Sequence, residues 1–325
     1  MKSSTRAALI VAIVLIVAGA VIVGGSLLTG NSFLDLFSSR AGKMETNTYP
    51  VSDPFTSVSV TDTVSDIRFE QSKAGECRVE CVEESKLKHV VTVENGVLTV
   101  LQKDERRWSD HIGMFTEPTS VTIYMPGGEY DSLNVKTDTG DVDVPADFSF
   151  GTLRIESDTA DIACLAGASE SAEFATDTGD IRIGHTLLGN LNMKTDTGRI
   201  TIESVSLSGG VRISSHTGHV GLTDITCAGT EITTTTGRVT LTRCLISGKL
   251  DIETDTGDVL LDAADADEIE IDTDTGDVTG TLLSEKIFFV ESDTGKIEVP
   301  RSMTGGPCEI ETSTGDVKIS IADGS

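Results

Sequence analysis

The chain has 325 residues, of which 52 are acidic and 25 are basic, so its formal net charge is −27 at pH 7. This charge excludes a general nucleic-acid binder, because phosphate recognition needs clustered Lys and Arg, which do not occur beyond the first few residues. Hydrophobic residues make up 38% of the chain and aromatic residues 4%, which excludes both a disordered acidic polymer and a helical globule with an aromatic core.

The first predicted element is a transmembrane helix over residues 7–28. The stretch is apolar and uncharged, and more than twenty helical residues cover about 30 Å of hydrocarbon. Lys2 and Arg6 precede it, so the tail 1–6 is expected in the cytoplasm and the rest of the chain outside the cell. A cleaved signal peptide is the alternative, but its apolar core is usually about 7–15 residues long. The absence of a second apolar span in the sequence argues against a channel or transporter for a monomer.

A tether is predicted over residues 29–47, followed by an irregular β-rich portion over residues 48–131. Alternating residues predict strands at 57–60, 66–69 and 120–126, and Asn95-Gly96 between two alternating runs predicts a hairpin. We expect this portion to start the repeat array and to cover its first coil, because solenoid ends expose unpaired backbone.

A repeat organises residues 132–321, and a tail of residues 322–325 follows it. The nine intervals between its turn residues are 19 or 20 residues long and average about 19.4, a period typical of solenoids. The turn residues are Gly140, Ala160, Gly179, Gly198, Gly218, Gly237, Gly257, Gly276, Gly295 and Gly315.

The residues around each turn predict half-buried strands. An apolar residue stands five positions before every turn and Val or Ile two positions after it, with polar and apolar residues alternating between. The glycine supplies a positive φ or a close backbone approach at a corner, so Ala160 predicts a corner of different shape.

Two folds fit this pattern, a parallel β-solenoid and an antiparallel meander in which Thr-Gly is a hairpin turn. The constant period favours the solenoid, because stacked coils force every corner to hold register whereas hairpins tolerate variable loops. The predicted fold class is therefore all-β, a single-stranded parallel β-helix of about ten coils that stack about 4.8 Å apart into a rod of about 48 Å.

These features together resemble the DUF4097 family of bacterial putative adhesins, which carry β-strand repeats and a membrane anchor. The resemblance covers residues 48–321 and rests on FTSVSVTDTVSDIRFEQ (55–71), SVTIYMPGGEYDSLNVKTDTGDVDV (120–144) and the serial TDTGDV-type coils. It implies a β-helical surface domain at the bacterial cell membrane and supplies no catalytic residues.

Asp-Thr-Gly occurs six times and is also the catalytic tripeptide of aspartic proteases. That chemistry needs two carboxylates about 3 Å apart in a closed cleft, whereas here the tripeptide is periodic and degrades to other residues in some repeats. A structural corner motif explains it, so no catalytic residue is predicted.

The same residues predict stacked carboxylate columns, one of which begins Asp138, Asp158, Asp177. Like charges 4.8 Å apart repel by about 0.9 kcal/mol in water, and Ca²⁺, which takes six to eight oxygen ligands, could relieve the repulsion. The alternative is that each Asp accepts backbone N–H groups at its own corner and water screens the rest. No metal or cofactor site is therefore assigned, and Ca²⁺ stays an open alternative.

The periodic Ser and Thr residues and the cysteines are predicted to have structural roles. Ser or Thr stands three positions before every turn and Thr one position before, and stacked hydroxyls can bond to both neighbours along a ladder. Cys227 and Cys244 lie 17 residues apart, close to one coil, so they could face one another in adjacent layers as a disulfide, although core packing explains them equally well. No Cys/His spacing suggests zinc.

The sequence predicts a single-pass, membrane-anchored, non-catalytic binding or adhesin-like module on the cell surface. The partner would be a cell-envelope or host protein or a glycan, and not nucleic acid; the open edge of the C-terminal coil could also support self-association. An envelope-stress regulator is one alternative. A polysaccharide-cleaving β-helix enzyme is another, but the regular intervals leave no room for the long loops of a catalytic groove.

Overall fold

The computed structural model describes residues 43–73, 75–106, 118–184 and 187–322. Every regular element in these ranges is a β-strand, as predicted. The predicted transmembrane helix at 7–28 lies outside the described residues, and none of the described residues form a helix that is long and apolar enough to cross a membrane.

The chain divides into two compact units, which we describe separately. The smaller unit consists of Met1–Glu45, Glu83–Lys88 and Lys103–Pro118. In its described residues the backbone N–H of Ser85 donates to the carbonyl of Lys43 (3.0 Å), and Lys88 Nζ lies 3.0 Å from Glu45 Oε2. The larger unit, Thr46–Val82, His89–Gln102 and Thr119–Ser325, contains the repeats.

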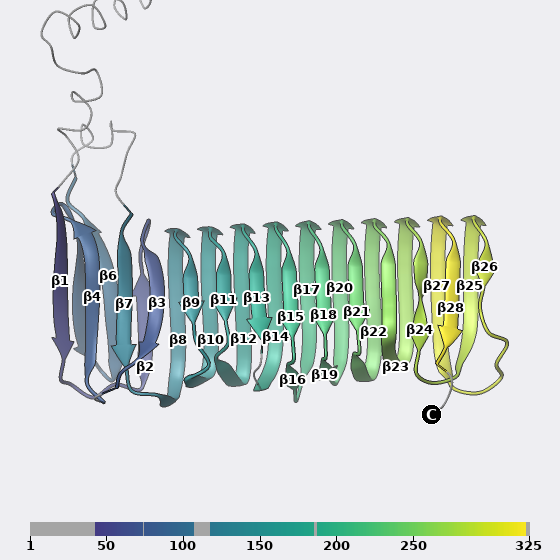
Figure 1. Cartoon of the computed structure of the whole chain (residues 1–325), viewed down its shortest axis with the longest axis horizontal. Coiled ribbons are helices and arrows are strands. Elements are labelled where there is room, and N and C mark those ends of the chain that lie inside the picture. The colour runs from purple at the N-terminus through teal and green to yellow at the C-terminus, as the bar shows by residue number, and fades with distance from the viewer. Residues whose placement is uncertain (1–42, 74, 107–117, 185–186, 323–325) are drawn as a thin grey trace, which may run out of the picture. The chain divides into compact units, whose positions relative to one another are not determined.

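Seven strands precede the regular repeats (Figure 1). They are β1 (Met44–Val51), β2 (Ser57–Thr61), β3 (Asp66–Gln71), β4 (Cys77–Glu84), β5 (Leu87–Glu94), β6 (Val97–Asp104) and β7 (Ser120–Met125). The predicted turn at Asn95-Gly96 separates β5 from β6 with φ values of 52° and 79°, the conformation of a type I′ hairpin turn.

The repeats supply the remaining strands, generally a long strand before each glycine turn and a shorter one after it. They are β8 (Gly128–Thr139), β9 (Val142–Val144), β10 (Phe148–Thr159), β11 (Ile162–Cys164), β12 (Gly167–Thr178), β13 (Ile181–Gly184), β14 (Leu187–Thr197), β15 (Ile200–Glu203), β16 (Ser206–Leu207), β17 (Gly210–Thr217), β18 (Val220–Thr223), β19 (Thr226–Cys227), β20 (Gly229–Thr236), β21 (Val239–Thr242), β22 (Leu245–Thr256), β23 (Val259–Thr275), β24 (Val278–Leu282), β25 (Lys286–Thr294), β26 (Ile297–Glu298), β27 (Gly306–Thr314) and β28 (Val317–Ile321).

The repeats stack as a parallel β-solenoid, which confirms the prediction and excludes the meander. Ile162 pairs in parallel with Val142 on one side and Ile181 on the other, so equivalent residues of successive coils lie over one another. The inward residues fill a continuous core: Ile155, five positions before a turn, is 0% exposed, and Ile162, two positions after it, is 1% exposed.

Close backbone approach explains the glycine at the corner. A Cβ on Gly198 would lie 1.9 Å from the carbonyl oxygen of Gly179 in the adjacent coil, far inside van der Waals contact. Ala160 adopts no positive φ, and neither do five of the nine turn glycines. Its N–H donates to the Thr178 carbonyl of the adjacent coil (3.0 Å), as the N–H of Gly179 does to that of Thr197, so the predicted difference in corner shape is not observed.

A second column of corners has left-handed backbone without glycine. Ser204, Asp224, Arg243 and Ala263 follow one another at intervals of 19 or 20 residues with φ between 52° and 57°. Each residue of this type pays about 1–2 kcal/mol for the left-handed conformation. In two of these corners the side chains compensate, because Arg243 Nε donates to Asp224 Oδ1 across the layers (2.6 Å).

The order of the layers at the C-terminal end differs from the order in the sequence. Strand β27 pairs with β23 on one side and with β25 on the other, and β28 lies likewise between β24 and β26 (Figure 1). The last coil is therefore an inner layer, and the open edge belongs to β25 and β26. The prediction that the final coil in the sequence forms this edge is wrong, because the period fixes register but not the order of stacking.

The N-terminal end shows the same arrangement. Strand β2 lies between β6 and β8, and β3 lies between β7 and β9, so the first coil in the sequence is enclosed by two later ones. Beyond β7 the sheet continues with β4, which pairs antiparallel to it from Arg78 opposite Tyr124 to Val82 opposite Ser120. The expectation that this portion covers the first coil is thus confirmed.

Candidate functional site

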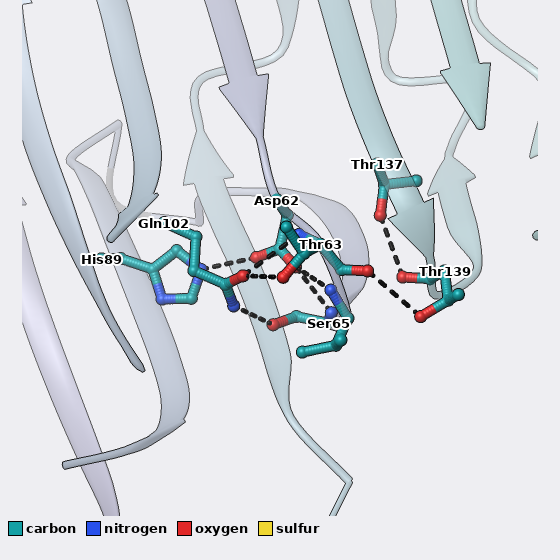
Figure 2. A network of polar contacts seen from close by, with 8 residues as sticks. Asp62, Thr63, Ser65, His89, Gln102, Thr137 and Thr139 are labelled. Carbon is teal, nitrogen blue, oxygen red and sulfur yellow. Dashed lines mark hydrogen bonds and ion pairs between the residues drawn. The ribbon is translucent and has the colours of Figure 1, made fainter. Parts of the chain in front are cut away.

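A buried polar network lies where β2 turns into β3 (Figure 2). Asp62 follows β2 directly, and its Oδ1 accepts the backbone N–H groups of Val64 (2.7 Å) and Ser65 (2.6 Å), which forms the turn. Its Oδ2 lies 2.6 Å from Nε2 of His89 on β5, and both side chains are 0% exposed. A carboxylate in such a site is retained because each oxygen has a hydrogen-bond partner.

Gln102 on β6 extends the network to a third layer. Its Oε1 accepts the backbone N–H of Thr63 (3.1 Å) and also the Thr63 hydroxyl, while its Nε2 lies 3.4 Å from the Ser65 hydroxyl. The Thr63 carbonyl in turn accepts the N–H of Thr139 at the end of β8 (2.8 Å) and also the Thr139 hydroxyl (3.1 Å), the contact drawn in Figure 2. The network joins the coils at the N-terminal end of the solenoid, and because its His–Asp pair is closed to solvent it cannot meet a substrate.

Sequence reasoning did not find this network. Asp62 belongs to the segment TDTVSDIRF, which resembles a repeat, and it occupies the place before a turn where Asp accepts backbone N–H groups. His89 and Gln102 lie in the irregular portion, 27 and 40 residues further on, and no periodicity relates them to Asp62.

An open groove of about 540 Å³ crosses the outer face of five successive strands, β12, β14, β17, β20 and β22. One outward column, Glu173, Asn192, Arg212, Glu231 and Asp251, contributes a residue from each strand. Gly210 and Gly229, which pair with one another, leave backbone without side chains in its lining.

The charges in this groove form ion pairs, within the groove for Arg212 and Lys249 and with Arg154 outside it for Glu173. Arg212 Nη2 lies 2.7 Å from Glu231 Oε2, and Lys249 Nζ lies 2.8 Å from Asp251 Oδ2. The hydrogen bonds that Lys249 donates to the carboxylates of Asp251 and Glu270 raise its pKa, so it stays protonated at all physiological pH values. The groove therefore presents hydrogen-bonding groups with little net field, on a chain that is strongly acidic.

The column of Asp138, Asp158 and Asp177 is exposed, and among the described residues no three carboxylates bring oxygens within 4.8 Å of one another. The structure thus places these residues in a row but does not gather them into a chelating set. We make no Ca²⁺ proposal from them.

The neighbouring Asp column, one position after the turn, binds backbone. Asp141 Oδ1 accepts the N–H of Asp161 (3.0 Å), and Asp161 Oδ1 accepts the N–H of Asp180 (2.7 Å). Each carboxylate thus bonds to the next layer, not to its own corner as expected. The same column also contains Arg238, whose side chain pairs with a carboxylate of the next layer, with Nη2 3.0 Å from Asp258 Oδ2.

The repeats and the portion before them match one known protein family over most of the chain. The family described as Toastrack DUF4097 matches residues 55–320. The chain belongs to this family. Its match covers β2 to β28 apart from the last residue, which includes the buried network, the groove and both ends of the solenoid.

Several solved structures are similar to the chain at low sequence identity. A putative lipid binding protein from Parabacteroides distasonis ATCC 8503 has 16% identity and a TM-score of 0.51, over 74% of this chain and 97% of that one. A putative adhesin from Bacteroides fragilis NCTC 9343 has 14% identity and a TM-score of 0.41, over 85% and 97%. A putative adhesin from the same P. distasonis strain has 14% identity and a TM-score of 0.42, over 83% and 97%. No curated protein matches the chain.

The inward hydroxyls of the Toastrack coils bond to corner carbonyls, not to each other as expected. Thr137 Oγ1 donates to the Thr139 carbonyl (2.9 Å), and Thr176 Oγ1 donates to the Thr178 carbonyl (3.1 Å). In four consecutive layers the buried hydroxyl has no partner among the described residues: Ser215, Thr234, Thr254 and Thr273. This column of Ser and Thr side chains therefore has a structural role, which is to fill the space inside the corner.

None of the six cysteines of the Toastrack chain, all of which lie in the described ranges, forms a disulfide. Cys227 pairs in register with Ile246, two positions beyond Cys244, so the 17-residue spacing does not place the two cysteines over one another as proposed. Both are buried in the core, and burial raises the pKa of Cys244 to about 11 and of Cys164 to about 12. Thiols this far from ionisation are poor nucleophiles.

Proposed function

We propose that this chain is a non-catalytic binding module whose groove over β12 to β22 holds a neutral, hydroxyl-rich polymer, that is, a glycan of the cell envelope or of a host surface. The observation that carries the proposal is the composition of the groove. It combines the amides of Asn190 and Asn192 with exposed glycine backbone and with charges that are already paired.

Pairing within the groove favours this ligand class over charged ones. A polyanion would meet bases whose charge Glu231 and Asp251 already neutralise, and a cation would compete with Arg212 and Lys249 for the same carboxylates. Sugar hydroxyls can donate to the carboxylates and accept from the guanidinium and amide groups without breaking either pair. The five strands offer the same column of side chains along the stack, which suits an extended chain.

Two other activities fit less well. One solved structure of the same fold carries the name putative lipid binding protein, but an acyl chain needs an apolar enclosed cavity, and this groove is open. Catalysis by the His89–Asp62 pair is disfavoured because both side chains are fully buried.

A matched pair of variants tests the groove. Asn192 and Asn134 stand in the same outward column. Asn192 lines the groove, whereas Asn134 on β8 lies two layers beyond β12, the first strand of the groove. Asn192→Ala should weaken retention of the chain on immobilised envelope or host glycans about tenfold, and Asn134→Ala should leave it unchanged. Equal retention of both variants, or cleavage of the glycan by the wild-type chain, would contradict the proposal.

We also propose that residues 7–28 anchor the chain in the bacterial cell membrane, with residues 1–6 in the cytoplasm and the solenoid outside. The uncharged run of apolar residues and the basic residues before it support this placement. A membrane-impermeant thiol label should modify an Asp138→Cys variant on intact cells, and alkaline carbonate should not extract the chain. Labelling only after lysis would contradict the proposed orientation.

A further inference from the structure

The outermost C-terminal layer, residues 286–305 with β25 and β26, is incompletely covered. Ile297 occupies an inward column in which Val278 and Val317 of the layers beneath are 0% exposed, yet Ile297 itself is 44% exposed. Val290 is half-buried, whereas Ile310, its partner in β27, is 0% exposed. These side chains point where core residues point but lack a layer above them.

Apolar side chains also gather on the outside of this end. Of the nine large hydrophobic residues that are exposed among the described residues, five lie between residues 283 and 303. They are Leu283 (44%), Ile287 (36%), Phe289 (58%), Ile297 (44%) and Met303 (93%). A concentration of this kind on an otherwise acidic rod marks an interaction surface.

The layer at the open edge carries no net charge, whereas the coil before it in the sequence is strongly acidic. Residues 286–305 carry three acids and three bases, whereas residues 267–285 carry seven acids and no base. Two copies of the chain would repel one another along their sides, since each carries a net charge of −27, but not at this end. The layer that topology places at the open edge is thus neutral.

The layer is firmly attached to the solenoid, so its exposure is not a frayed end. Lys286 at the start of β25 is 3% exposed, and its Nζ lies 2.6 Å from Asp265 Oδ1 on β23, two layers below. The residue that pairs with Lys286 in the intervening strand is Gly306, where a Cβ would lie 1.8 Å from the carbonyl oxygen of Asp267 on β23. The exposed edge of β25 and β26 is therefore part of the folded solenoid.

We propose that two copies of this chain associate tail to tail, with the open edge of β25 and β26 in one copy against the same edge in the other. Among the described residues β25 pairs only with β27 and β26 only with β28, so one row of backbone N–H and C=O groups on each is open to another strand. A second copy supplies a matching row, an equally apolar and equally neutral surface, and a coil of identical cross-section. The two-fold arrangement closes on itself and stops at a dimer.

Sedimentation of the purified full chain in detergent tests this interface. The wild-type chain should form a species of twice its 34.3 kDa at micromolar concentration. Phe289→Asp places a negative charge against its own copy, and it should raise the dissociation constant about a hundredfold. Leu245→Asp is the matched control, because Leu245 is similarly exposed (49%) but lies on β22, away from the edge, and it should leave the dimer intact.

Three results would overturn the proposal: a wild-type chain that stays monomeric, a folded Phe289→Asp variant that stays dimeric, or assemblies that keep growing with concentration, as head-to-tail stacking would. Should Phe289→Asp fail to fold, hydrogen exchange of the wild-type chain decides instead. The amides of β25 should exchange at least tenfold more slowly at dimer-forming concentration than at high dilution, and equal rates would overturn the proposal.

Discussion

The two ends of the solenoid differ in how their outermost layer is covered. At both ends the terminal coil of the sequence is enclosed by a neighbouring coil, but only the N-terminal end has a further cover. There the inward residues Leu98 and Val121 of the outermost parallel layer are 0% exposed, and β4 continues the sheet in the antiparallel direction. At the C-terminal end Ile297 is 44% exposed. The comparison teaches that a cap, not the order of coils, decides which end can accept another strand.

The largest expected effect lies in the buried network of the N-terminal end. Asp62→Ala removes the acceptor of two backbone N–H groups and the partner of His89, and it should lower the free energy of unfolding by about 3–5 kcal/mol. Asp138→Ala, in an exposed column, should change it by less than about 0.5 kcal/mol. Urea unfolding of both variants measures the difference, and equal midpoints would mean that the network does not hold this end together.

Corner glycines at the two ends should respond unequally. A Cβ on Gly140 would lie 2.3 Å from the Ser65 carbonyl oxygen, and one on Gly295 would lie 1.9 Å from that of Gly315. The coil of Gly140 is enclosed on both sides, whereas that of Gly295 has a neighbour on one side and can shift outward. Gly140→Ala should therefore cost about 3 kcal/mol and Gly295→Ala about 1 kcal/mol in chemical unfolding. A larger loss at Gly295 would contradict the open-edge description.

The pH dependence of stability allows a buried thiol near one end of the solenoid to be compared with a buried thiol near the other end. Burial raises the pKa of Cys164 and of Cys308 from the ordinary value of 9.0 to about 12. The unfolded chain loses these protons first, so stability is complete below pH 9 and falls as the pH rises towards 12. Between pH 8 and pH 10 each thiol should account for about 1 kcal/mol of the loss, which Cys164→Ala and Cys308→Ala should each remove. A smaller share for Cys308 would show that the C-terminal end opens more readily.

The smallest expected effect concerns the left-handed corners between the two ends. Ala263 has a φ of 52°, so Ala263→Gly relieves strain and should raise the free energy of unfolding by about 0.5–1 kcal/mol. Ala163 on β11 has no positive φ, and Ala163→Gly should lower the stability by a similar amount. Thermal melting of both variants provides the test; a loss of stability at both positions would remove strain as a feature of these corners.

The sequence predicted the fold and the register because one coil repeats with a nearly constant period. Val142 and Ile162 share a column in the repeat, and they pair in the structure. The period could not predict the order of the end layers, because the coils of β25–β26 and β27–β28 carry the same pattern and either order satisfies it. Stacking depends instead on side chains outside the pattern, such as Lys286 reaching Asp265 past Gly306.

The candidate sites were less predictable than the fold. The groove is a property of an outward column, and outward residues vary from coil to coil without affecting the pattern. The Asp62–His89 contact joins a repeat-like turn to the irregular portion, where no spacing relates the two residues. Cys227 and Cys244 show that a small error in spacing changes the predicted contact. Cys227 pairs with Ile246, and this offset of two residues is enough to keep the two cysteines from facing one another.

The enclosed last coil has a consequence for how the chain is made. Residues 286–298 leave the ribosome before residues 306–321, yet the later segment must end up beneath the earlier one. An incomplete chain can lay β25 directly on β23 with every threonine in register, but this order leaves no place for β27 between the two strands. Correct winding at this end therefore has to wait for the final residues, so a prematurely terminated chain cannot reproduce the finished rod.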